Sequence, residues 1–211
     1  MSAEGKAERY RGLYYRRYQH FVQMEYLGKV ESFRVLKGWT KGKVLDVGCG
    51  VGYITNFLGG YGIEVNKTAL RIAKRNFPHL ELICACGDNL PFLSGTFDTV
   101  LCYNVLEHLT EEEREKTFAE MKRVLSKDGF FLAGMADLEY TVNLIIGLVT
   151  RDMSTCDPTH KFSWNGKEFR DVISKYFNVI EARRTSGYGR LLKITKYFKG
   201  DIMMKCCKKE I

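Results

Sequence analysis

The sequence predicts an α/β protein with a doubly wound sheet of seven strands, mostly parallel, and helices on both faces. Short apolar segments typical of strands alternate along the chain with segments of helical periodicity. Such alternation indicates parallel strands joined by helices. The first strand begins at Val44 and runs into a turn that contains Gly48, Gly50 and Gly52. Glycines there let a ligand lie against the backbone at the start of the next helix.

The remaining elements follow from local signals. Asn66 and Thr110 are suited to cap the helices that follow them, and three glutamates after Thr110 suit the positive end of a helix dipole. Helices are expected at residues 67–77, 111–125 and 166–177. Further strands are expected at residues 62–66, 80–85, 97–104, 130–136, 178–184 and 191–198.

The glycine turn differs from the one that binds dinucleotides. A dinucleotide fingerprint places its third glycine three residues after the second, whereas Gly52 follows Gly50 by two. Asp46 stands two residues before Gly48 and would direct a negative charge at the mouth of the turn. That charge suits a cationic amine better than a phosphate.

Four segments together resemble one enzyme family. Residues 44–52 read V-L-D-V-G-C-G-V-G, and an acid, Glu64, stands at the tip of the second strand. Residues 87–92 read G-D-N-L-P-F, and residues 97–109 contain F-D-T-V followed by V-L-E-H-L. In this order they resemble the motifs of class I S-adenosylmethionine-dependent methyltransferases. The resemblance implies a Rossmann-like sheet whose last strand lies antiparallel beside the fifth.

The same resemblance implies S-adenosylmethionine as cofactor and S-adenosylhomocysteine as product. It assigns the glycine turn to the methionine end, the second strand tip to the ribose, the G-D-N loop to the adenine, and the fourth strand end to the side facing the methyl group. An ionised glutamate can accept from both ribose hydroxyls because it offers two oxygens and no donor. The expected cofactor residues are Asp46, Gly48, Gly50, Glu64, Val65, Asp88, Asn89, Tyr103 and Asn104.

Two histidines are candidates for catalysis. A base is required only when the nucleophile arrives protonated or as an acidic carbon. His108 follows the fourth strand, where it either moves a proton or orders its loop. His160 ends a D-P-T-H segment between the fifth and sixth strands, which resembles small-molecule members allied to quinone-biosynthesis methyltransferases. Both interpretations stay open for each histidine, and no metal is expected.

Charge divides the chain into three expected parts. Of the net charge of +8, residues 1–43 carry +6 and residues 193–211 carry +4, which leaves −2 for the core. We expect a basic, aromatic helical lid at 1–43, a cofactor-binding methyltransferase domain at 44–198 and a basic tail at 199–211. The leading helix either covers the cofactor or packs on the sheet. The basic flanks either attract an anionic partner or are solvated faces.

Composition and absent motifs narrow the function. The seven cysteines form no C-x-x-C pair, the start is polar, and the longest apolar run, 142–149, is too short to span a membrane. We expect a cytoplasmic enzyme without a transmembrane segment. The (D/N)-P-P-(Y/F) motif of nucleic-acid amine methylators is missing, so nucleic acid is not favoured. The expected reaction is methyl transfer to an O, N or C nucleophile of a small molecule. An RNA or protein methyltransferase docking through its basic flanks and a non-catalytic cofactor-binding module stay open, as does the oligomeric state.

Overall fold

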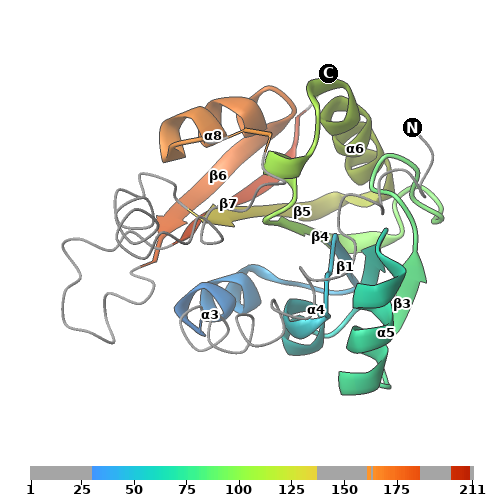
Figure 1. Cartoon of the computed structure of the whole chain (residues 1–211). Coiled ribbons are helices and arrows are strands. Elements are labelled where there is room, and N and C mark those ends of the chain that lie inside the picture. Colours follow the sequence, from blue (N-terminus) through green and yellow to red (C-terminus); the bar gives the residue numbers. More distant parts are fainter. Residues whose placement is uncertain (1–29, 137–160, 163, 186–200, 210–211) are drawn as a thin grey trace, which may run out of the picture.

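Seven strands form one sheet in the order β3-β2-β1-β4-β5-β7-β6 within the described part of the chain (Figure 1). The computed structural model describes residues 30–136, 161–162, 164–185 and 201–209. Only β7 runs antiparallel to its neighbours, β5 and β6. The strands are β1 (Val44–Val47), β2 (Tyr61–Glu64), β3 (Glu81–Cys84), β4 (Phe97–Tyr103), β5 (Leu125–Ala136), β6 (Phe177–Arg184) and β7 (Asp201–Lys208). The predicted fold class is confirmed.

Helices cover both faces of this sheet. In Figure 1, α3, α4 and α5 lie on one face, and α6 and α8 lie on the other. The helices are α3 (Val30–Trp39), α4 (Tyr53–Leu58), α5 (Lys67–Asn76), the short 3-10 helix η1 (Leu106–His108), α6 (Glu111–Val124) and α8 (Gly166–Ser174). Both predicted N-caps are present, because the Asn66 side chain accepts from two backbone amides and Thr110 forms a capping box with Glu113.

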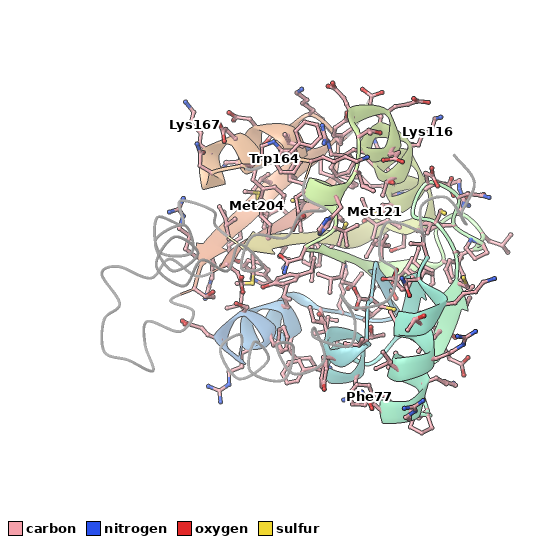
Figure 2. The ribbon with its side chains drawn as sticks, viewed as in Figure 1. Phe77, Lys116, Met121, Trp164, Lys167 and Met204 are labelled. Carbon is pink, nitrogen blue, oxygen red and sulfur yellow. The ribbon has the colours of Figure 1, made fainter. Side chains whose placement is uncertain are left out.

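The two faces of β4 bury different sets of apolar side chains. Val100 and Cys102 belong to the core beneath α6 and α8, and Leu101 and Tyr103 to the core beneath α3 and α4. This alternation follows from the two-residue repeat of a strand. Figure 2 shows Met121 and Met204 between the sheet and the helices above it, whereas Lys116 and Lys167 point outward.

The seventh strand is not where the sequence predicted it. We expected a strand at 191–198 and a basic tail at 199–211, but residues 201–208 form β7 between β5 and β6. Met203, Met204 and Cys206 are fully buried, and the Lys205 ammonium lies 3.8 Å from the centre of the Phe130 ring. A strand covered on both faces loses the alternation that identifies strands in a sequence. Without that alternation, the lysines of this segment led to its prediction as a basic tail. Residues 191–198 lie outside the described residues.

The predicted lid is described only in its last third. Residues 1–29 lie outside the described residues, and α3 packs Phe33, Leu36 and Trp39 against the core that contains Leu58 and Leu132. This part is a helix packed on the sheet, and a lid over the cofactor stays a prediction. Among the described residues, no helix combines the length and apolar character needed to cross a membrane.

Candidate functional site

The predicted cofactor residues come from strand ends that meet at one edge of the sheet. Strands β3, β2, β1 and β4 are neighbours and parallel, so their carboxyl ends lie together. The chain order reverses between β1 and β4, because β2 and β3 lie on one side of β1 and β4 on the other. Ligands of open α/β sheets bind at such a reversal point. The order of strands therefore places the predicted groups around one crevice.

The glycine turn closes tightly on one side and is open on the other. Gly48 has φ 78° and lies so near Val105 that a Cβ at this position would collide with the valine side chain. The amides of Gly48 and Cys49 donate to the Ile63 carbonyl at 2.8 and 2.9 Å, which ties the turn to β2. At Gly50, with φ 52°, a Cβ would meet nothing within 4 Å. The backbone at Gly50 is therefore a surface on which a ligand can rest.

Glu64 links the glycine turn to the start of α5. One carboxylate oxygen accepts from the Gly50 amide at 3.0 Å and the other accepts from the Asn66 amide at 2.9 Å. The side chain is 9% exposed, and burial raises its pKa while the bonds from Asn66 and Gly50 oppose that rise. A carboxylate has about four acceptor sites. Both oxygens can therefore still accept from hydroxyl groups of a ligand.

Asp46 is a buried residue of β1, two positions before the glycine turn. It is 2% exposed, and it accepts a 2.6 Å hydrogen bond from the Thr55 hydroxyl of α4. Burial raises the pKa of Asp46 to about 7, against the effect of the Thr55 bond and with a further rise from the charge of Glu64. A nearby cation would favour the ionised form. The sequence did not predict the role of Thr55, although a hydroxyl residue three positions after Gly52 is a visible signal.

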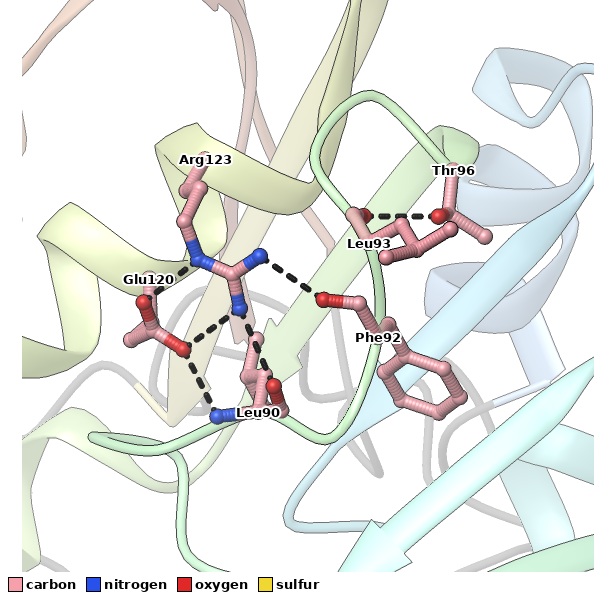
Figure 3. Close-up of polar contacts among 6 residues, drawn as sticks. All are labelled: Leu90, Phe92, Leu93, Thr96, Glu120 and Arg123. Atoms are coloured by element: carbon pink, nitrogen blue, oxygen red, sulfur yellow. Dashed lines mark hydrogen bonds and ion pairs between the residues drawn. The ribbon is translucent and has the colours of Figure 1, made fainter.

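The loop between β3 and β4 carries Asp88 and Asn89 and is held by α6 (Figure 3). The Leu90 amide donates to Glu120 at 2.7 Å, and the Arg123 guanidinium donates to the carbonyls of Leu90 and Phe92 at 3.0 and 2.7 Å. The Asn89 amide donates to the Cys86 carbonyl at 3.2 Å. The resemblance implies that the amide after the loop's acid donates to the adenine ring, and such a bond requires this turn to open or the amide to be shared between two acceptors. Glu120 and Arg123 were not predicted.

The end of β4 changes direction sharply at Asn104. This residue has φ 53°, in the left-handed region, and its amide donates to the Gly134 carbonyl at 2.9 Å. Backbone in that region costs energy and is concentrated at functional sites. The Tyr103 ring instead belongs to the buried core under α3 and α4. Asn104 thus lies directly after the carboxyl end of β4, and the ring of Tyr103 before it is 6% exposed.

The turn after β4 contacts both the glycine turn and the chain that follows His160. His108 is the last residue of η1 and is partly buried. His160 lies outside the described residues. The amides of Lys161 and Phe162 donate to the Glu107 carbonyl at 2.9 and 3.2 Å. The segment after His160 thus rests on η1, and a catalytic role for either histidine stays a prediction.

Arg114 strengthens this attachment. Its guanidinium lies 4.6 Å from the centre of the Phe162 ring and 4.9 Å from that of Trp164. The two rings stack at 5.4 Å, and Lys161 forms a 3.1 Å ion pair with Glu113. These contacts fix residues 161–164, where described, against the first turns of α6. The described residues contain no cluster of three or more side chains suited to hold a metal.

A separate hollow lies at the opposite edge of the sheet. It encloses about 360 Å³ between α6 and the turn from α8 to β6. Its lining residues are Glu115, Phe118, Ala119, Lys122, Lys175, Tyr176 and Lys209. Because Lys175 and Tyr176 precede β6, this hollow is remote from the carboxyl ends of the parallel strands. It is not the predicted cofactor site.

Similarity to known proteins agrees with this geometry. Residues 45–133 match the model of a methyltransferase domain family. An uncharacterized methyltransferase of Bacillus cytotoxicus is 37% identical over 94 residues, which cover 42% of this chain and 44% of that protein. A ubiquinone/menaquinone biosynthesis C-methyltransferase of Campylobacter jejuni is 32% identical over 111 residues, covering 47% of this chain and 45% of that protein. The chain spans about half the length of the curated relatives it matches.

Solved structures share the fold over almost the whole chain. A Thermotoga maritima protein, described as an S-adenosylmethionine-dependent methyltransferase and possible histamine N-methyltransferase, superposes with a TM-score of 0.73 at 17% identity. The match covers 97% of this chain and 99% of that one. A putative methyltransferase of Haloferax volcanii, solved with an activator protein, gives a TM-score of 0.69 at 14% identity, over 91% and 93% of the chains. The family resemblance predicted from the motifs is confirmed.

Proposed function

We propose that this chain, a class I S-adenosylmethionine-dependent methyltransferase, transfers the methyl group of that cofactor to an O, N or C nucleophile of a small molecule by in-line displacement. One observation carries the proposal: Asp46 and Glu64 lie in the last two residues of adjacent strands, and Asp88 follows the next strand, around a glycine turn that is open at Gly50. The cofactor offers an amine, a ribose and an adenine in that sequence. The three acids therefore match its three polar parts in order.

The buried carboxyls fit a cationic ligand. Within the described residues neither Asp46 nor Glu64 forms an ion pair, and burial raises the pKa of both. A positive charge in the crevice would offset the cost of ionising them. In the proposed complex Asp46 faces the ammonium group, Glu64 accepts from the ribose hydroxyls, and Asp88 accepts from the exocyclic amine of adenine.

Chemistry at the sulfonium needs little from the protein. The cofactor supplies a methyl group that is already activated, because its leaving group is a neutral thioether. The chain's part is to hold the nucleophile in line, which lowers the barrier by several kcal/mol. The turn at Asn104 and η1 border the place where the methyl group would lie. His108 or His160 would accept a proton when the acceptor carries one.

A small acceptor is supported by the names of similar proteins. The Campylobacter jejuni relative is a ubiquinone/menaquinone biosynthesis enzyme, and the Thermotoga maritima neighbour is described as a possible histamine methyltransferase. Both names refer to small molecules. Lys161 and Phe162 bond to η1 and would form one wall of the acceptor site.

Turnover with an isotope-labelled methyl donor tests the proposal. The protein is incubated with the labelled donor and a metabolite extract, and labelled products are identified by mass spectrometry. We expect one labelled small molecule, and its formation should fall at least tenfold in Asp88→Ala. Label transferred only to protein or RNA would contradict the choice of acceptor. No transfer to any fraction, despite cofactor binding, would favour the non-catalytic module.

A second candidate function is methylation of an RNA or protein that docks on a basic surface. The observation that favours it is the hollow at the far edge, which Lys122, Lys175 and Lys209 border with one acid, Glu115. An anionic macromolecule bound there would be released steeply by salt. Turnover that requires such a partner at low salt, and is lost at high salt, would support this candidate.

A further inference from the structure

The loop between β3 and β4 is held from one side by two charged residues of α6. Residues 85–96 contain no helix or strand. Leu90, in the middle of the loop, is 3% exposed and packs in the core. Asp88 precedes Leu90 by only two residues, so their Cα atoms are within about 7.6 Å. An anchored Leu90 therefore limits the positions that Asp88 can take.

Glu120 and Arg123 form an ion pair with two parallel hydrogen bonds, in addition to their contacts with the loop. Arg123 Nε donates to one oxygen of Glu120 at 2.7 Å, and its Nη2 donates to the other at 2.8 Å (Figure 3). Such paired, charge-assisted bonds fix the plane of the guanidinium. The bonds with Arg123 lower the pKa of Glu120, against the effect of its partial burial. The pair is therefore charged at neutral pH.

This fixed pair then engages both polar groups of Leu90. Glu120 accepts from the Leu90 amide at 2.7 Å, and Arg123 donates to the Leu90 carbonyl at 3.0 Å. Arg123 also donates to the Phe92 carbonyl at 2.7 Å, and its own carbonyl accepts from the Gly95 amide at 2.9 Å. Four bonds from one turn of α6 thus determine the path of a loop that has no secondary structure of its own.

α6 also packs on the sheet through apolar side chains. α6 is held to the sheet by Phe118, Met121 and Val124, which are each at most 1% exposed. The side chains of Arg123 and Glu120 are 34% and 20% exposed, so they lie at the border of the loop rather than in the core. Their hydrogen bonds to the loop are made at Leu90 and Phe92, and Asp88 lies two residues before Leu90.

We infer that Glu120 and Arg123 are positioning residues that set the preference of the site for adenine. The inference rests on the proposed function, in which Asp88 accepts from the exocyclic amine of the base. Glu120 and Arg123 do not touch the cofactor. They hold Leu90, and through it the carboxylate of Asp88, in the place where the amine is recognised.

The test compares two ligands that differ only at this amine. S-adenosylhomocysteine carries it, and the 6-deamino analogue, in which purine replaces adenine, has a hydrogen on carbon in its place, which cannot donate to a carboxylate. Calorimetric titration gives the Kd of both for the wild type, Arg123→Met, Arg123→Lys and Glu120→Gln. A bond to a charged acceptor predicts a roughly ten- to hundredfold preference for adenine in the wild type. We expect Arg123→Met and Glu120→Gln to reduce it to a few fold, and Arg123→Lys to lie between.

An ion pair on another element serves as control. Arg183 and Glu181 form a 2.6 Å ion pair on β6, and their side chains are 58% and 36% exposed. The variant Arg183→Met should keep the full preference. Hydrogen exchange at the Leu90 amide should accelerate in Arg123→Met and not in the control.

Three outcomes distinguish the inference from its premise. A reduced adenine preference, with faster exchange at Leu90, supports the positioning role. An undiminished preference in Arg123→Met and Glu120→Gln overturns the role while leaving the proposed function intact. A wild type that binds neither ligand overturns the proposed function and the inference with it. Should Arg123→Met fail to fold, Arg123→Lys and Glu120→Gln decide by the same ratio.

Discussion

Replacing Asp46 with asparagine should make the protein more stable above neutral pH and weaken its cofactor binding. Asp46 is 2% exposed. Burial, and to a smaller extent the charge of Glu64, raise its pKa from 3.8 to about 7, while the hydrogen bond from Thr55 acts in the opposite direction. Asparagine has nearly the same shape, and its oxygen can still accept from the Thr55 hydroxyl. The substitution therefore removes the charge with little change of packing.

The magnitude follows from linkage between proton binding and folding. Between about pH 4 and 7 the folded state holds a proton on Asp46 that the unfolded state has released, so stability falls as the pH rises through this window. A shift of about three units corresponds to roughly 4 kcal/mol as an upper bound. The Cys49 thiol beside it remains neutral, because burial first, and then the charges of Asp46 and Glu64, raise its pKa well above its ordinary value.

Urea unfolding at pH 5 and pH 8 measures this difference. Relative to the wild type, Asp46→Asn should gain stability between pH 5 and pH 8, by up to about 2.5 kcal/mol, because about two of the three units of the shift lie in this interval. The affinity for S-adenosylhomocysteine should change with pH in the opposite direction to the stability. Wild-type affinity should rise as the pH approaches 7, by at most tenfold per unit, and then level, whereas the affinity of Asp46→Asn should be lower and independent of this titration.

Two results would refute the reasoning about Asp46. Parallel stability profiles for the wild type and Asp46→Asn would mean that the folded state does not perturb this carboxyl. Equal affinity of both proteins for S-adenosylhomocysteine at pH 8 would mean that Asp46 does not face the ammonium group. Thr55→Val provides a further check, because loss of the hydroxyl should shift the wild-type profile to higher pH.

Three further predictions concern other parts of the chain. Gly50→Ala should cost about 1–2 kcal/mol because of its left-handed backbone and should abolish S-adenosylhomocysteine binding in a folded protein; retained affinity in a calorimetric titration would show that no ligand rests on this turn. Met203→Asp should destabilise the fold by at least about 4 kcal/mol in urea, because its side chain is fully buried in β7, whereas a solvated tail would tolerate it. The effect of burial is outweighed by the bonds from Thr110 and Lys161, which lower the pKa of Glu113 to about 2. The wild type therefore has stability at neutral pH that it loses as the pH falls from about 4.5 towards 2, and Glu113→Gln should lack this contribution. Identical acid unfolding curves for the two proteins would contradict this.

The sequence predicts best where backbone geometry leaves few alternatives. The turn from Gly48 to Gly52 requires left-handed backbone, and the caps at Asn66 and Thr110 require particular side chains. The residue types in the sequence therefore identify the turn and both caps. Strand ends in a parallel sheet must meet at one edge. The acids at or near the carboxyl ends of β1, β2 and β3 could therefore be grouped without a structure.

What the sequence did not predict depends on burial by distant segments. Met203 and Cys206 are covered on both faces of β7, so their strand lacks alternation, and its lysines resembled a tail. Asp46 is buried and bonded to Thr55, which α4 brings to it from nine residues along the chain. Glu120 and Arg123 are three residues apart on a charged helix, where solvated pairs are common, and nothing local indicates that they face a loop.

Titration of the wild-type protein with S-adenosylmethionine and, separately, with a nicotinamide dinucleotide tests the central claim most directly. Three acids around a turn open at Gly50 predict binding of one S-adenosylmethionine per chain, lost or strongly weakened in Asp88→Ala, and no measurable binding of the dinucleotide. Binding of the dinucleotide without binding of S-adenosylmethionine would contradict the account.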